Sequence, residues 1–284
     1  RAARRSPVNR RYSAPLSPAE AREFLPFMQE LVQIANGVIR PLFMSGTAVI
    51  DKADASPVTQ ADRGAEAALR RAIEARYPAH AIVGEEWGSK EGSGYRWVLD
   101  PVDGTRAFIT HCFLFGTLIA LERWVQDEHG AGFRPVLGCI SHPAAGLAVL
   151  GHLGGATLHA ADGSARAVAL RPCTRLEDAT VLLTSLPGLG EQVAPRLERV
   201  PALLARARLA RTWGDCFGYF ALATGGADLM LDPKLAYWDV AAIVPVIEGA
   251  GGVVTSWDGG DPLASPSLIA CGPDLQPEVL RLLA

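Results

Sequence analysis

The segment Trp97–Ile109 constrains the fold of this chain more than any other stretch. It reads WVLDPVDGTRAFI, an apolar run that ends in Asp100 and Asp103, two aspartates three residues apart. Pro101 and Gly104 are turn formers, so the segment predicts a strand that ends in a tight turn. The two carboxylates would point to one side of that turn, where they are stable only beside cations or with one of them protonated.

The oxygen atoms of this turn predict a metal site. If the turn closes, the carbonyl of Val102 faces the same region, and such a mixture of hard oxygens suits Mg²⁺ or another small divalent ion. Two more acids hold comparable positions, because Glu85 follows a short strand-like run and Asp239 begins a predicted helix. Taken singly, these features also fit a turn motif, a surface acid and a helix cap. Their joint occurrence favours the metal site.

Thr105 is a candidate contact to phosphate. It follows Gly104 at the expected N-terminus of a helix, where free N–H groups bind phosphate oxygens. Its hydroxyl could orient a water molecule. The alternative is an N-cap threonine without a ligand.

The composition narrows the class of protein. The chain has 284 residues, enough for two domains or one large layered domain. Its net charge of −3 shows no strong preference for nucleic acid or acidic lipid, and we expect neither as a partner. No stretch approaches the roughly 18 apolar residues of a membrane span. Five cysteines stand singly without a CxxC pair, which favours a reducing, cytoplasmic compartment.

The beginning of the chain is rich in arginine. The first nineteen residues hold five arginines and no acid. We interpret residues 1–16 as a disordered or targeting-like tail. If the segment is an organellar transit peptide, the protein would be located in an organelle instead of the cytoplasm.

The remaining residues predict two halves of different character. A capping box at Ser17 opens an amphipathic helix, and a second helix is expected over 62–77. Short β-type runs between 114 and 160 predict an antiparallel meander. After about 175 strands alternate with helices, one of them expected from about 190 to 207. We therefore expect an N-terminal α+β half over 17–175, with an antiparallel sheet and the metal site, and a C-terminal α/β half over 176–284.

These motifs resemble the inositol monophosphatase family of metal-dependent phosphatases. The likeness rests on GEE at 84–86, WVLDPVDGTRAF at 97–108 and WDVAAIVPVIEGAGG at 238–252, in the order and spacing of the family. It implies an α+β fold, the layered α-β-α-β-α sandwich of the inositol monophosphatase and fructose-1,6-bisphosphatase type, usually as a homodimer. It also implies Mg²⁺-dependent hydrolysis of small phosphate monoesters by a water molecule that the metal activates.

The resemblance implies a role for each matched residue. Two or three Mg²⁺ ions would be held by five ligands: Glu85, Asp100, the carbonyl of Val102, Asp103 and Asp239. The catalytic set is Asp62 and Thr105, which would orient the attacking water and take its proton, together with Glu85. The backbone of Gly104 and Thr105 would contact the phosphate.

The stretch GDCFGYFALATGGADLML at 214–231 most resembles the histidinol-phosphatase branch of this family. Histidinol phosphate carries an ammonium and an imidazole, and Asp215 and Asp232 could bind that positive charge. The alternatives are a helix N-cap for Asp215 and a turn residue for Asp232. Inositol 1-phosphate, or another small sugar or nucleotide phosphate, is the second candidate substrate. A non-catalytic regulator that binds phosphate or metal is the third reading.

Overall fold

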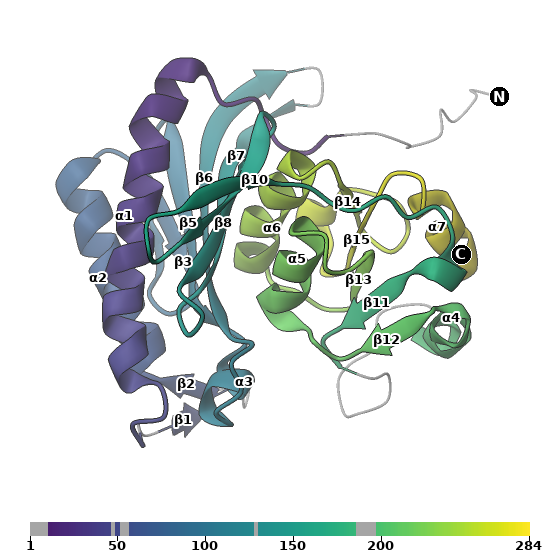
Figure 1. Ribbon diagram of the computed structural model, residues 1–284. Helices are drawn as coiled ribbons and strands as arrows, with labels where there is room; N and C mark the ends of the chain where they lie inside the picture. Colours follow the sequence, from purple (N-terminus) through teal and green to yellow (C-terminus); the bar gives the residue numbers. More distant parts are fainter. Residues whose placement is uncertain (1–10, 47–48, 52–56, 128–129, 186–196) are drawn as a thin grey trace.

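The computed structural model describes residues 11–46, 49–51, 57–127, 130–185 and 197–284, and these form five stacked layers (Figure 1). Two helices cover an eight-stranded sheet, and two further helices separate that sheet from a five-stranded one. A last pair of helices packs on the outer side of the second sheet. The α-β-α-β-α sandwich predicted from the sequence is therefore confirmed.

The first layer consists of α1 (Pro18–Leu42) and α2 (Gln60–Arg76). Each helix begins with a capping box, in which Ser17 and Thr59 supply the N-cap side chains. Each also carries an apolar stripe at helical spacing that packs against the first sheet. In α1 this stripe includes Phe24, Phe27, Leu31, Ala35 and Ile39, all buried.

The first sheet has the strand order β10-β9-β8-β7-β6-β5-β3-β4. All neighbouring strands are antiparallel except β3 and β5, which are parallel. The meander predicted between 114 and 160 is confirmed in β6 to β9. The strands are β3 (Ala81–Gly84), β4 (Gly88–Lys90), β5 (Tyr95–Asp103), β6 (Gly116–Asp127), β7 (Gly130–His142), β8 (Leu147–His152), β9 (Gly155–Ala160) and β10 (Ala165–Val168).

The third layer, α5 (Asp215–Ala223) and α6 (Tyr237–Gly249), lies between the two sheets (Figure 1). Every residue of α6 from Asp239 to Glu248 is buried. A helix that is apolar on nearly all sides is expected in such a position. The sandwich therefore places the first turn of α6 beside the first sheet, and α6 contacts β5, β6, β7 and β8.

The second sheet has the order β12-β11-β13-β15-β14. Its strands are β11 (Thr180–Leu183), β12 (Leu209–Arg211), β13 (Leu229–Asp232), β14 (Val253–Thr255) and β15 (Leu268–Cys271). The outer helices are α4 (Val200–Arg206) and α7 (Gln276–Leu283). Of the helix predicted over about 190–207, residues 190–196 lie outside the described part of the chain, and α4 occupies most of the rest. Short elements complete the fold: β1 (Val49–Asp51), β2 (Pro57–Thr59), α3 (Thr105–Ile109), and the 3₁₀ turns Leu176–Asp178, Leu197–Arg199 and Pro262–Ala264.

The N-terminal segment packs against the third layer where the structure describes it. The tail predicted over 1–16 is described from Arg11 onward, and there Tyr12 is buried. The N–H groups of Tyr12 and Ser13 donate to the two carboxylate oxygens of Glu248, at 2.7 and 3.0 Å.

The boundary predicted after residue 175 falls between β10 of the first sheet and β11 of the second. Across the described ranges, no helix combines the length and the apolar content that crossing a bilayer requires.

Candidate active site

A β-bulge shapes the end of β5 and directs its two aspartates. Asp100 lies opposite Leu118 of β6, whereas Asp103 lies opposite Gly116, so the register shifts between the two aspartates. An extra residue in one strand bends that strand and redirects its side chains, which is a frequent device beside active sites. The strand therefore continues through Pro101 to Asp103 with a bulge where the sequence predicted a tight turn, and the chain leaves the strand at Gly104.

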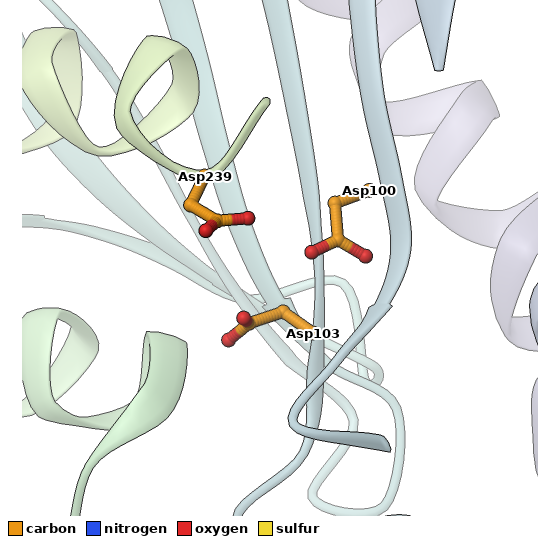
Figure 2. A group of neighbouring side chains, drawn as sticks. All are labelled: Asp100, Asp103 and Asp239. Carbon is orange, nitrogen blue, oxygen red and sulfur yellow. The ribbon is translucent and has the colours of Figure 1, made fainter. Parts of the chain in front are cut away.

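The third acid comes from the second half of the chain. Asp239 lies in the first turn of α6, and its carboxylate accepts a hydrogen bond of 2.8 Å from the N–H of Ala236. One oxygen each from Asp100, Asp103 and Asp239 lies within 4.8 Å of the others. Figure 2 shows the three carboxylates around a common space, two of them from β5 and one from α6. Two distant parts of the chain thus meet at one acidic group.

Burial and mutual repulsion shift the protonation of this group. Burial foremost, and then the charges of neighbouring acids, raise the pKa of Asp100 well above its usual range. Burial likewise raises the pKa of Asp103 and that of Asp239 to about 7 each. Oδ1 of Asp100 is buried without a hydrogen-bond partner among the described residues. Buried carboxylates in this state fit a divalent cation, which would supply the missing positive charge.

Glu85 lies next to this acidic group. It follows β3, the parallel neighbour of β5, and its N–H donates to the carbonyl of Leu99 at 3.2 Å. Its charge is among the causes that raise the pKa of Asp100. Its carboxylate is not one of the three whose oxygens meet within 4.8 Å. The structure thus places Glu85 at the edge of the acidic group.

Thr105 and Asp62 are in direct contact. Oγ1 of Thr105 lies 3.1 Å from Oδ1 of Asp62 and 3.0 Å from the carbonyl oxygen of Val102. Asp62 is buried in the first turn of α2, where Thr59 donates to its other oxygen through N–H and hydroxyl. Burial raises the pKa of Asp62, and its hydrogen bonds from Thr59 and Thr105 oppose that shift. The carboxylate is therefore held by its partners in one orientation.

Gly104 and Asp215 meet at the start of two helices. Gly104 has a left-handed backbone (φ +78°), and a Cβ there would lie 2.9 Å from Oδ2 of Asp215. Asp215 begins α5, and its N–H donates to the hydroxyl of Thr184 at 2.9 Å. The next N–H, of Cys216, donates to Oδ2 of Asp103. The N-terminus of α5 therefore borders the acidic group.

Asp232 is buried at the end of a strand of the second sheet. It ends β13, is 1% exposed and accepts a hydrogen bond of 2.8 Å from the hydroxyl of Tyr219. Burial raises its pKa to about 7. Its charge is among the causes that raise the pKa values of Asp103 and Asp239, so it lies near them.

One supporting residue was not predicted from the sequence. Glu66 of α2 is fully buried and accepts the N–H groups of Glu86 and Trp87 at 2.8 and 3.2 Å. A Cβ at Gly84 would lie 2.0 Å from Oε1 of Glu66, so only glycine fits there. Glu66 thereby fixes the turn that carries Glu85. The available signal was an acid on the inner face of the predicted helix over 62–77.

Comparisons with known proteins agree with this geometry. The model of the inositol monophosphatase family matches residues 20–284. The bifunctional phosphatase IMPL2, chloroplastic, of Arabidopsis thaliana is 38% identical over 248 residues, covering 86% of this chain and 67% of that protein. A histidinol-phosphatase of Chlorobaculum parvum is 37% identical over 213 residues, covering 74% and 76%. A solved inositol monophosphatase from Zymomonas mobilis superimposes with a TM-score of 0.78 at 32% identity, covering 93% of this chain and 98% of that one.

Proposed function

This chain belongs to the inositol monophosphatase family of phosphatases, and we propose that it hydrolyses L-histidinol phosphate to L-histidinol and phosphate with the aid of Mg²⁺. The observation that supports the metal-dependent chemistry is the meeting of one oxygen from each of three acids within 4.8 Å. Asp100, Asp103 and Asp239 would hold the metal, with Glu85 and the carbonyl of Val102 completing a site for two or three ions. Bound divalent ions would polarise the phosphoryl group and lower the pKa of water.

Asp62 and Thr105 are the proposed proton-handling pair. The Thr105 hydroxyl lies between the Asp62 carboxylate and the Val102 carbonyl, so its direction is fixed before substrate binds. Its oxygen can accept a hydrogen bond from the attacking water. Burial raises the pKa of Asp62, which makes its carboxylate a better proton acceptor at neutral pH. The backbone of Gly104 and Thr105, where α3 begins, would contact the phosphate.

Asp215 supports histidinol phosphate as the substrate. Its carboxylate contacts the Gly104 turn, where the phosphate is expected, so it would lie close to a substrate cation. A charge-assisted hydrogen bond suits the ammonium or imidazolium of histidinol phosphate and gives less to a neutral polyol. Asp232, buried behind the site, would contribute negative potential. The histidinol-phosphatase relative supports this choice, and the solved inositol monophosphatase supports inositol 1-phosphate as the second candidate.

We also propose a cytoplasmic homodimer. The dimer is expected from the family resemblance, and the compartment from five cysteines that are all free thiols. Organellar targeting through the arginine-rich N-terminus remains the alternative location.

The experiment is a parallel assay of phosphate release from histidinol phosphate, inositol 1-phosphate and fructose 1,6-bisphosphate, with Mg²⁺ and with EDTA. We expect Mg²⁺-dependent release that is fastest from histidinol phosphate. Release from inositol 1-phosphate alone would overturn the substrate, and release from none would favour a non-catalytic regulator. Asp100→Asn should lower kcat roughly 100-fold or more, because even outer partners of a metal ligand are worth about 10- to 100-fold.

A second variant tests the substrate separately from the metal. Asp215→Asn removes a charge from a residue that is not among the proposed metal ligands. It should lower kcat/KM for histidinol phosphate by roughly 10- to 100-fold, the value of a hydrogen bond to a charged group, and change hydrolysis of inositol 1-phosphate much less. An equal loss for both substrates would refute the role of Asp215 in selecting the substrate.

A further inference from the structure

A ring of hydrogen bonds joins the start of α6 to the first sheet. Glu122 of β6 is fully buried, and its Oε2 accepts from Nε of Arg96 at 2.5 Å. A guanidinium nitrogen of Arg96 donates to the hydroxyl of Tyr237 at 2.6 Å, and that hydroxyl donates to Oε1 of Glu122. The three side chains therefore close a ring in which both carboxylate oxygens have a donor.

Burying the charged groups of this ring costs free energy, because they lose their contact with water. Burial raises the pKa of Glu122, which shows that the carboxylate loses solvation, and the hydrogen bonds from Arg96 and Tyr237 offset that loss. The Arg96 guanidinium also lies over the ring of Phe133, 4.3 Å from its centre. Apolar side chains of similar volume would stabilise such a site at least as well. Unlike apolar contacts, the hydrogen bonds of charged and hydroxyl groups are directional, so they fix the orientation of the joined elements relative to one another.

The aligned elements are those that bring the acidic group together. Arg96 and Asp100 belong to the same strand, β5, and Glu122 lies directly opposite Arg96 on β6. Tyr237 is the first residue of α6 and precedes Asp239 by two positions. We infer that Tyr237, held by Arg96 and Glu122, is a positioning residue that fixes the first turn of α6 so that Asp239 meets Asp100 and Asp103. This inference rests on the proposed metal site.

The same strands carry a second network that serves as a matched control. One residue along, on the opposite face of the sheet, the hydroxyl of Tyr95 donates to Glu20 of α1 at 2.6 Å. Arg123 donates to the same Glu20 oxygen, also at 2.6 Å. This network has the same three residue types, but it joins the sheet to α1. It therefore has no member on α6, the helix that carries Asp239.

The test compares Tyr237→Phe with Tyr95→Phe, each of which removes one hydroxyl from its network. Mg²⁺ affinity is measured by calorimetry without substrate, and thermal unfolding is measured in EDTA. We expect both variants to lose similar stability, while only Tyr237→Phe binds Mg²⁺ more weakly, by about tenfold. Its half-saturating Mg²⁺ concentration for hydrolysis should rise, and excess Mg²⁺ should restore most of kcat.

Equal Mg²⁺ affinity in the two variants would overturn the positioning role while leaving the proposed function intact. A wild-type protein that binds no Mg²⁺ would overturn both. If Tyr237→Phe does not fold, Glu122→Gln against Glu20→Gln makes the same comparison, and the same two results decide it.

Discussion

At the scale of single residues, protons would compete with the proposed metal ions for the same carboxylate oxygens. Asp100 and Asp239 are buried and Asp103 is partly buried beside them, and each holds its proton to a higher pH than an exposed aspartate would. A divalent ion would offset both causes of this shift, burial foremost and then repulsion, so binding the ion and releasing protons would be linked events. The protein without metal should therefore be the less stable form wherever these acids are ionised.

The pH dependence of stability follows from the same shifts. Asp103 and Asp239 have folded-state pKa values of about 7, above those of an unfolded chain. Such groups stabilise the fold below the unfolded-state pKa, and that contribution is lost as the pH rises through the folded-state pKa. Metal-free protein should thus lose stability as the pH rises from about 4 to about 7. Thermal unfolding in EDTA measures this.

Asp103→Asn isolates the contribution of the acidic group from other titrations. The variant should lose less stability than the wild type over the same pH range, and Mg²⁺ should stabilise it less at about pH 8. Identical pH profiles for the two proteins would contradict the repulsion that we describe.

At the scale of elements, the turn from β5 into α3 sets the geometry of the site. The bulge between Asp100 and Asp103 redirects the strand, and Gly104 then takes a left-handed backbone that starts α3. The N-terminus of α5 closes the other side, where the N–H of Cys216 reaches Asp103. A short turn would therefore carry the proposed metal-binding, phosphate-binding and substrate-selecting contacts at once.

Gly104→Ala tests this turn. A left-handed backbone costs a residue with a Cβ roughly 1–2 kcal/mol, and here the Cβ would also press on Asp215 at 2.9 Å. Gly88→Ala is the matched control, because Gly88 has a similar φ of +67° but no atom within 4 Å of the added Cβ. Both variants should unfold at lower temperature, and only Gly104→Ala should also lose kcat/KM. Equal activity in the two variants would show that the contact with Asp215 does not matter.

At the scale of the whole molecule, the site exists because the sandwich brings distant segments to one place. The acids of β5 and α6 are more than a hundred residues apart in the sequence, and α6 is buried between the two sheets. The far end of α6 is fixed in turn by the N-terminal segment, whose N–H groups at Tyr12 and Ser13 donate to Glu248. We therefore expect that the Glu248 end of α6 contributes to stability, whereas the Asp239 end determines the geometry of the site.

Glu248→Gln tests that separation. The amide keeps one acceptor but places an NH₂ group against a backbone N–H, so we expect a loss of about 1–3 kcal/mol in the free energy of unfolding. Because Glu248 lies at the opposite end of α6 from Asp239, kcat should stay near the wild-type value. Chemical denaturation and the phosphatase assay measure the two quantities. A large loss of kcat at the temperature where the variant is folded would show that the two ends of α6 are coupled.

The parts of the fold and site that could be predicted are those encoded by short-range patterns. The capping box at Ser17 and the Asp-Pro-Val-Asp-Gly turn are readable because their physics is local. The contact between Thr105 and Asp62 needed the family resemblance, since nothing local joins positions 43 residues apart. Glu66 and the Arg96–Glu122–Tyr237 ring were not predicted. In the sequence, these charged and polar residues look like ordinary surface residues. Their burial results from tertiary packing, which the residue type alone does not reveal.

The central claim is that Asp100, Asp103 and Asp239 bind divalent metal, and anomalous diffraction from crystals grown with Mn²⁺ tests it most directly. Mn²⁺ accepts the same oxygen ligands as Mg²⁺ and scatters anomalously. The account predicts a strong anomalous peak among these three carboxylates, within about 2.5 Å of their oxygens. Well-ordered carboxylates with no peak between them, in crystals whose Mn²⁺ concentration supports full activity, would contradict it.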